Sequence, residues 1–326
     1  MTTLSRPARA CIDAFMSETI LITGVAGSLA RHTAQALAAQ GHTVVGMDYR
    51  PRPDDLPDDM VFYQANYNKT RIEEAFRNHN PSVVLHLGRV GNLKVHLNKR
   101  FDLNVIGSAK VMELCLKYKV RRLLILSTFH IYGAHPQNHI PISEDDPIRA
   151  GQTFPQLADA IQLDNQAITW MYKHPELHSI VLRPCNVIGP RIHNAISRYL
   201  RSSPKLYVAG FNPMWQFIHE TDLIEAILLA TGSDVIGVYN VAGGGTIPIV
   251  HALKLTKSTM VPIPAPAADL YLKVASQFKP AFPPYLLNFF KYPCVITDEM
   301  FRDAFGYAPT FGIEESIRSC VDVSSP

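Results

Sequence analysis

The sequence predicts a doubly wound α/β fold, in which helices cover both faces of a parallel sheet. Two observations carry this prediction. The first half of the chain alternates short apolar runs, rich in β-branched residues, with longer amphipathic segments, which is the pattern of alternating strands and helices. The short runs are almost wholly apolar, as strands buried on both faces of a sheet are. We therefore expect a parallel sheet from the first half and a smaller, mostly helical lobe from the second.

The expected strands and helices alternate along the first half of the chain. Strands are expected at 19–23, 42–48, 60–65, 82–88, 122–128 and 179–184. Helices, in which apolar residues recur every three or four positions, are expected at 28–40, 69–79, 104–119 and 158–173. After about residue 190, prolines and aromatic residues interrupt this regularity. The segment 281–293 can serve as core of the lobe, as the wall of a binding site, or as a surface for a partner or a membrane.

Composition and charge exclude several classes of protein. The chain has 326 residues, of which 47% are hydrophobic, so it can bury a large core. Its 31 Lys and Arg nearly balance its 28 Asp and Glu, which gives no basis for a nucleic-acid partner. No run approaches the roughly 20 apolar residues of a membrane span. The five cysteines are scattered without metal-ligand spacing, so we expect reduced thiols in the cytoplasm and no metal site.

The segment ILITGVAGSLARHTAQAL contains the first strand and opens the first helix. Gly24 and Gly27 allow a tight turn and a close approach of the backbone to a pyrophosphate, whose charge the helix N-terminus favours. Asp48 ends the second strand 21 residues after Gly27, where a carboxylate can bind the hydroxyls of an adenosine ribose. A carboxylate repels a 2′-phosphate, so NAD is favoured over NADP, while Arg50 and Arg52 leave NADP open.

Further motifs resemble the extended short-chain dehydrogenase/reductases, the group that contains the NAD-dependent epimerases and dehydratases. They follow the glycine segment in the family's order: VVLHLG (83–88), NVIGSAKVMELC (104–115), LSTFHIYG (126–133), LRPCNVIGP (182–190), QFIHETDLIEAI (216–227), YNVAG (239–243) and FGYAPTFGIEESI (305–317). The resemblance covers the chain from about Thr19 to Ile317 and implies a Rossmann fold. It implies an extension at 1–16, an NAD-binding domain at 17–190 with returning segments at about 216–245, and a mainly substrate-binding lobe at 191–326.

The resemblance also implies which residues contact the cofactor. Asn66 stands where the family often has an aspartate near the adenine amine, and an amide oxygen accepts the same hydrogen bond. Pro184 and Asn186 are expected close to the nicotinamide amide. The full implied set is Gly24, Ala26, Gly27, Ser28, Leu29, Asp48, Asn66, Leu87, Asn104, Pro184 and Asn186.

The family's proton-transfer pair is missing from the chain. Working members use a Tyr and, four residues later on the same helix face, a Lys that lowers its pKa, together with a Ser or Thr after the fifth strand. Thr128 matches the Ser or Thr, but the best register of the YxxxK motif falls on QLADA, with Gln156 at the Tyr position and Ala160 at the Lys position. Asp164, an acidic residue at the family's usual distance, supports this register. An amide is no base near neutral pH, so we expect ordinary alcohol oxidation to be slowed on the order of 10²–10⁴-fold.

Three other side chains are candidates to replace the pair. His130 lies in the loop after the fifth strand, and histidine has a suitable pKa; a loop histidine with a purely structural hydrogen bond is the alternative. Tyr132 belongs to the family's own YG motif, where it is usually structural. His219 is expected to pack under the second lobe.

A second departure from the family concerns the substrate. Members that bind sugar nucleotides usually carry an Arg two residues before the phenylalanine of their RxFIHV-like stretch, and this Arg clamps the diphosphate. Trp215 holds the matching position here, which favours a flatter or more apolar ligand, unless the ring only fills the lobe interface. Arg191 can still meet a phosphate. We therefore expect a small-molecule substrate other than a standard sugar nucleotide.

Two functions remain open at this point. The first is an NAD-dependent oxidoreductase, similar to the epimerases and dehydratases, with an atypical acid-base site in which Thr128 orients the reactive oxygen. The second is a non-catalytic NAD-binding protein with a structural or regulatory role. The resemblance also implies a possible homodimer through the helices that follow the fourth and fifth strands.

Overall fold

The computed structural model of the chain describes residues 17–57, 59–67, 70–91, 95–268 and 285–322. The expected N-terminal extension, 1–16, and the first part of the segment 281–293 therefore lie outside the described residues. The proposed division into domains at about residue 190 stays a prediction.

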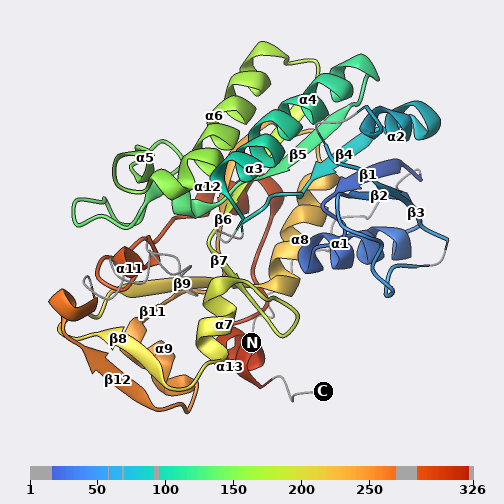
Figure 1. Ribbon diagram of the computed structural model, residues 1–326. Helices are drawn as coiled ribbons and strands as arrows, with labels where there is room; N and C mark the ends of the chain where they lie inside the picture. The colour runs from blue at the N-terminus through green and yellow to red at the C-terminus, as the bar shows by residue number, and fades with distance from the viewer. Residues whose placement is uncertain (1–16, 58, 68–69, 92–94, 269–284, 323–326) are drawn as a thin grey trace, which may run out of the picture.

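A seven-stranded parallel sheet forms the centre of the molecule (Figure 1). Its order is β10–β6–β5–β4–β1–β2–β3, so the first strand lies inside the sheet and the chain winds outward in both directions. This is the doubly wound arrangement that the sequence predicts. The strands are β1 (Thr19–Thr23), β2 (Thr43–Asp48), β3 (Val61–Gln64), β4 (Val83–His86), β5 (Arg122–Leu126), β6 (His178–Pro184) and β10 (Gly237–Val241).

Helices cover both faces of this sheet. On one side lie α2, α4 and α6, and on the other lie α1 and α8 (Figure 1). The helices and turns of this part are α1 (Ser28–Ala39), α2 (Ile72–His79), α3 (Leu97–Phe101), the π-helical turn η1 (Asp102–Ile106), α4 (Gly107–Lys117), the 3₁₀ turn η2 (Phe129–Tyr132), α5 (Ala150–Thr153), the 3₁₀ turn η3 (Pro155–Leu157), α6 (Ala158–Lys173), α8 (Glu220–Thr231) and α12 (Glu299–Phe305).

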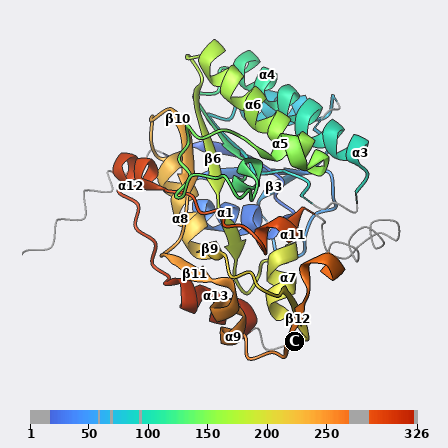
Figure 2. The same cartoon turned by 90° about the vertical axis from the view of Figure 1, so that its left-hand side faces the viewer.

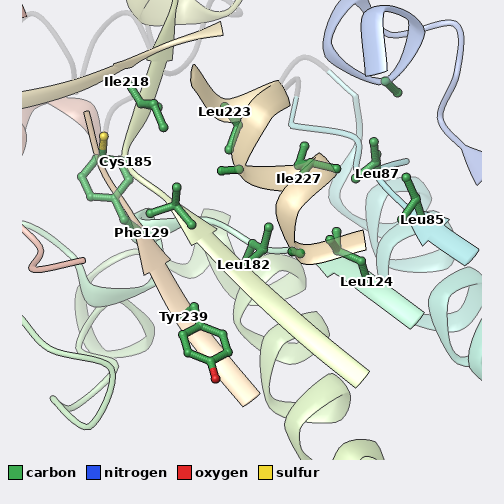
Figure 3. Packing of buried hydrophobic residues seen from close by; sticks show 14 of the residues in the cluster. Leu85, Leu87, Leu124, Phe129, Leu182, Cys185, Ile218, Leu223, Ile227 and Tyr239 are labelled. Carbon is green, nitrogen blue, oxygen red and sulfur yellow. The ribbon is translucent and has the colours of Figure 1, made fainter. Parts of the chain in front are cut away.

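The alternation of side chains along each strand builds two cores, one on each face of the sheet. In β1, Ile20 and Ile22 enter the core under α1 and α8, whereas Leu21 enters the core under α2, α4 and α6. Leu85, Leu124 and Leu182 pack against α8 in the first core, and Leu223 and Ile227 of α8 face them (Figure 3). Because both faces are buried, the strands need apolar residues at every position, which explains their composition.

The second lobe lies at one end of the molecule and combines helices with two small sheets (Figure 2). Strands β11, β9 and β7 form a three-stranded sheet, and β12 pairs with β8. These strands are an addition to the helical lobe that the sequence predicts. The elements are β7 (Asn186–Ile188), α7 (Ala195–Arg201), β8 (Lys205–Val208), β9 (Met214–His219), β11 (Thr246–Pro248), α9 (Ile249–Leu255), β12 (Met260–Ile263), α11 (Leu286–Phe289) and α13 (Ile313–Val321).

Candidate cofactor and active site

The turn between β1 and α1 brings two backbones into close approach. Gly24 has a φ of +78°, and a β-carbon on it would collide with the backbone of Gly88, which follows β4. Gly27 is the N-cap of α1, so no side chain caps this helix, and its first turn contains no acidic residue. The N–H groups at the start of α1 are therefore available to an anion such as a pyrophosphate.

Asp48 lies fully buried at the end of β2 with its carboxylate beside the glycine turn. The N–H of Ala26 donates to Oδ2 at 3.0 Å. Arg50 donates to the same carboxylate three times, from its backbone N–H, its Nε and its Nη2. The side-chain hydrogen bonds to Asp48, together with the charge of Asp48, raise the pKa of Arg50. Arg52 instead donates to the carbonyl oxygens of Met60 and Pro57. Arg50, and not Arg52, is therefore the arginine that lies at the expected position of the adenosine ribose.

Asn66 carries an unsatisfied acceptor. Its Oδ1 is buried and has no hydrogen-bond partner among the described residues, which is a costly arrangement unless a ligand supplies a donor. An adenine amine is such a donor, as the family resemblance implies for this position. With the open N-terminus of α1 and the buried Asp48, this orphaned oxygen makes the residues fit a dinucleotide.

Other residues of the predicted cofactor set have structural contacts. Asn104, in η1, accepts from the N–H of Val90 at 2.8 Å and donates to the carbonyl oxygen of the same residue at 3.1 Å. It thereby fixes the loop that follows β4. Leu87 is buried in the hydrophobic core, and Leu29 packs against that core. Ser28 starts α1, Pro184 ends β6 and Asn186 starts β7; a cofactor role for each of these residues stays a prediction.

Thr128 and His130 form a hydrogen-bonded pair at the carboxyl end of β5. Thr128 is the N-cap of η2, and its Oγ1 lies 3.0 Å from Nδ1 of His130. Nε2 of His130 is buried and makes no hydrogen bond with a described residue. Burial, together with the nearby charge of Arg89, lowers the pKa of His130 to about 3, while the side chain of Asn186 opposes this shift. The imidazole is therefore neutral near pH 7 and can accept the hydroxyl proton of Thr128.

Gln156 and Ala160, at which the family resemblance predicts the Tyr and Lys positions, have a different set of contacts around them. Gln156 lies in η3, just before α6, and Ala160 is buried in the first turn of α6. Between them, Asp159 is buried and pairs with Arg100 at 3.3 Å, and it accepts from Nδ2 of Asn104 at 2.6 Å. Arg100 also donates to the backbone oxygen of Gln156 at 2.9 Å. A buried ion pair thus occupies the start of α6, and the placement of the family's relay there stays a prediction.

Tyr132 belongs to a structural network. Its hydroxyl donates to Asn240 of β10 and accepts from Nη1 of Arg183, both at 2.8 Å. Arg183 binds Asp164 through two hydrogen bonds, from Nε at 3.1 Å and Nη2 at 2.6 Å, and Ser127 donates to the same carboxylate. Burial raises the pKa of Tyr132 to about 12. Asp164 therefore anchors α6 to β6, which places Gln156 and Ala160 at the carboxyl edge of the sheet.

The predicted substrate residues of the lobe are committed to other contacts. Nε1 of Trp215 donates to the backbone oxygen of Phe289 at 2.8 Å, and its ring packs edge-on against Phe290 with centroids 5.0 Å apart. Arg191 donates from Nε to the buried Glu220 at 2.9 Å. His219 caps α8 and stacks on Phe311, in agreement with packing under the lobe. Trp215 is thus part of the lobe core.

Sequence reasoning missed Arg89 and Tyr285, which both lie at this site. Electrostatic interactions connect Arg89 with His130, Tyr285 and Asp159, and the ring of Tyr285 packs edge-on against His130 at 5.5 Å. These residues come from the loop after β4 and from the segment before α11. The family motif at 83–88 ends directly before Arg89 and was the only sequence signal close to it. No local pattern indicates Tyr285.

The fold and the glycine turn define a doubly wound α/β protein of the dinucleotide-binding class. Residues 20–242, more than half of the chain, match the NAD dependent epimerase/dehydratase family. The chain therefore belongs to the NAD-dependent epimerase/dehydratase family, as its motifs indicate.

Individual relatives are distant. The chain is 28% identical over 236 residues to short-chain dehydrogenase/reductase family 42E member 1 of Xenopus laevis, which covers 65% of this chain and 58% of the relative. It is 22% identical over 259 residues to the UDP-glucose 4-epimerase of Caenorhabditis elegans, covering 73% and 71%. An uncharacterized protein of Mycobacterium tuberculosis is 27% identical over 173 residues, covering 52% and 45%. The chain thus spans about half the length of several curated relatives that it matches.

Solved structures share the whole fold. The UDP-glucose 4-epimerase of Thermus thermophilus in complex with NAD superposes with a TM-score of 0.74 at 24% identity, covering 94% of this chain and 98% of that one. The dTDP-glucose 4,6-dehydratase of Bacillus anthracis in complex with NAD gives 0.75 at 16% identity, covering 94% and 96%. At these identities the likeness establishes the fold of the chain.

Among the described residues, no helix combines the length and the apolarity that crossing a bilayer requires.

Proposed function

We propose that the protein is an NAD-dependent oxidoreductase with an atypical acid-base site, in which Thr128 holds the reactive oxygen of a small substrate. The observation that carries this proposal is the 3.0 Å hydrogen bond between Oγ1 of Thr128 and Nδ1 of His130. Because Nδ1 can take the hydroxyl proton, Thr128 can accept a hydrogen bond from a substrate hydroxyl and pass a proton on. The pair replaces the missing Tyr and Lys with a shorter relay.

NAD is the proposed cofactor, with NADP less favoured. When bound, the cofactor supplies the hydride acceptor. Asn66, the N-terminus of α1 and Asp48 have the free or buried polar groups that would hold it. Two structures with a similar fold are complexes with NAD. Arg50 must leave Asp48 before the adenosine ribose can bind, since its three bonds, with the bond from Ala26, use the acceptor capacity of the carboxylate.

The proposed proton transfer is slow by the standards of the family. Burial and the charge of Arg89 lower the pKa of His130 to about 3, so the imidazole accepts a proton at neutral pH only with difficulty. Gln156 offers a hydrogen bond to the substrate but no proton uptake. We expect turnover below that of members with an intact pair.

The substrate is proposed to be a small molecule other than a standard sugar nucleotide. Trp215 stands in the lobe core and Arg191 is paired with Glu220, so neither offers a free cation to a diphosphate. Aromatic rings surround His130 instead, at centroid distances of 4.5 Å for Phe129 and 5.1 Å for Phe289. This setting favours an apolar or aromatic group on the substrate.

A non-catalytic NAD-binding protein is the second candidate function. Two observations favour it: the low pKa of His130, and the burial of Ala160 beside the Asp159–Arg100 ion pair, which leaves the Lys position without a titratable group. In that case the dinucleotide would stabilise the fold, and the lobe would serve recognition or regulation.

Location and assembly complete the proposal. A cytoplasmic location is supported by Cys115, Cys185, Cys294 and Cys320, which are all free and buried. A homodimer through the helices α4 and α6 is supported by the family resemblance.

The test starts from purified protein. Any dinucleotide that co-purifies is released by acid and identified by mass, and NADH formation at 340 nm is then measured with a panel of alcohols and hydroxy acids. Slow NADH formation that Thr128→Ala abolishes, while Thr169→Ala on α6 leaves it unchanged, supports the enzyme. Bound NAD with no turnover of any alcohol supports the second candidate, and failure to bind either dinucleotide contradicts both.

A further inference from the structure

Arg89 is a cation without a counter-ion. Its side chain is half-buried directly after β4, and it makes no hydrogen bond or ion pair with any residue in the described part of the chain. Burial lowers its pKa, yet a guanidinium keeps its charge in proteins. No side-chain nitrogen of Arg89 is among the buried atoms that lack a partner, so its N–H donors are open to solvent and can be reached by a ligand acceptor.

The backbone that carries Arg89 is rigidly mounted. Its own N–H donates to the carbonyl oxygen of Leu87 at 3.0 Å, and Asn104 holds both the N–H and the carbonyl of Val90. Asn104 is in turn fixed by the carboxylate of Asp159. Three hydrogen bonds thus hold this loop and a fourth fixes Asn104, so the backbone of Arg89 is held in place at the carboxyl edge of the sheet.

Asp159, whose charge acts on Arg89, is shared with a second arginine. Asp159 already pairs with Arg100 and accepts from Asn104. Arg89 and Arg100 bring two positive charges to this cluster, and Asp159 brings one negative charge. One positive charge therefore remains unbalanced, in the part of the site where the family's lysine is missing.

Aromatic side chains surround His130, on which the charge of Arg89 acts. The ring of Tyr285 lies 5.5 Å from that of His130 and 6.1 Å from that of Phe154, and Phe289 lies 5.1 Å from His130. The hydroxyl of Tyr285 has no hydrogen-bond partner among the described residues, and burial raises its pKa to about 12, against the opposing effect of Arg89. The phenol is therefore a neutral donor next to the guanidinium.

We propose that Arg89 binds the carboxylate of the substrate, which is a hydroxy acid or oxo acid with an apolar or aromatic body. A guanidinium binds a carboxylate through two parallel hydrogen bonds, which fixes the acid in orientation. The aromatic rings then contact the apolar body, and Thr128 receives the reactive oxygen. This inference rests on the proposed oxidoreductase function and names the substrate class of the same site.

Binding of an acid also changes His130. The charge of Arg89 is the second cause of the low pKa of this histidine, after burial. A carboxylate on Arg89 cancels that charge and therefore raises the pKa of His130 from its value in the free protein. The substrate itself would make the imidazole a better proton acceptor.

The test uses benzoate and its neutral analogue benzamide as probes. Affinity is measured by calorimetry on the protein saturated with NADH, and on the free protein if NADH does not bind. We expect Arg89→Gln to weaken benzoate binding at least about tenfold, since a hydrogen bond to a charged group is being lost, and Arg89→Lys to weaken it less. Arg318→Gln, an exposed arginine in an ion pair on α13, is the matched control and should leave the affinity unchanged.

The outcomes separate this inference from the proposed function. Benzoate affinity unchanged in Arg89→Gln, or benzamide bound as tightly as benzoate by the wild-type protein, overturns the carboxylate site. A loss in Arg191→Gln instead of Arg89→Gln assigns the anion to the other arginine and also overturns it. If Arg89→Gln weakens NADH and not benzoate, Arg89 contacts the cofactor. Absence of NADH binding contradicts the proposed function, while benzoate binding to the free protein still decides the carboxylate site.

Discussion

Removing the carboxylate of Asp159 should destabilise the protein strongly. The side chains of Asp159 and Arg100 are only 1% and 5% exposed, and their ion pair measures 3.3 Å. In Asp159→Ala, Arg100 keeps its buried charge without a counter-ion, and Asn104 loses a 2.6 Å acceptor. Breaking a buried ion pair by removing one partner costs about 3–5 kcal/mol. We therefore expect the free energy of unfolding to fall by about that amount.

Urea unfolding followed by circular dichroism measures this change. Asp55→Ala is the control, because the Arg31–Asp55 pair is exposed, with 57% of the Asp55 side chain accessible, and should cost less than about 1 kcal/mol. Replacing both partners, Asp159→Leu with Arg100→Met, should restore most of the stability, since apolar pairs often substitute for buried ion pairs at little cost. A loss below about 1 kcal/mol in Asp159→Ala would refute the buried network at the start of α6.

Three further predictions concern the cofactor site, the relay position and acid. Arg50→Ala should tighten NADH binding, because it frees the carboxylate of Asp48, and should weaken NADPH binding; fluorescence titration measures both, and a tighter NADPH complex would contradict the assignment. Ala160→Lys should cost about 1–3 kcal/mol of stability by overpacking a buried site, and an unchanged melting temperature would count against it. Burial lowers the pKa of His86 to about 4 and that of His130 to about 3. As the pH falls, these histidines therefore become protonated in the unfolded chain at a higher pH than in the folded protein. Stability should be constant above about pH 6.5 and fall by about 2 kcal/mol per histidine down to about pH 5, whereas stability independent of pH over this range would show that one or both titrate normally.

The sheet was predictable because its strands are buried on both faces. An apolar run such as TILIT, which forms β1 without a change of bounds, carries a clear local signal. Strand β10 escaped the strand prediction because GVYNV contains a glycine and an asparagine. Asn240 is buried in this strand, and its side chain accepts a hydrogen bond from the hydroxyl of Tyr132. This contact joins residues that lie far apart in the chain. The small sheets of the lobe were missed because their strands are short.

The candidate site divides in the same way. The turn at Gly24, the carboxylate of Asp48 and the placement of Gln156 follow from short motifs with fixed spacing. The ion pair of Arg100 with Asp159 and the approach of Tyr285 to His130 join segments that no local pattern relates. The pairing of Arg50 with Asp48, only two residues apart, is the one omission that the sequence itself could have revealed.

We propose that Thr128 and His130 take up the substrate proton beside the cofactor site. The most direct measurement is the rate of NADH formation from an aromatic hydroxy acid, such as mandelate, with NADH affinity determined in the same samples for wild type and His130→Asn. The amide oxygen of Asn can keep an acceptor near the Nδ1 position but takes up no proton. We predict that NADH affinity stays the same while the rate falls at least about tenfold. An equal rate in His130→Asn, with the cofactor bound, would contradict the claim.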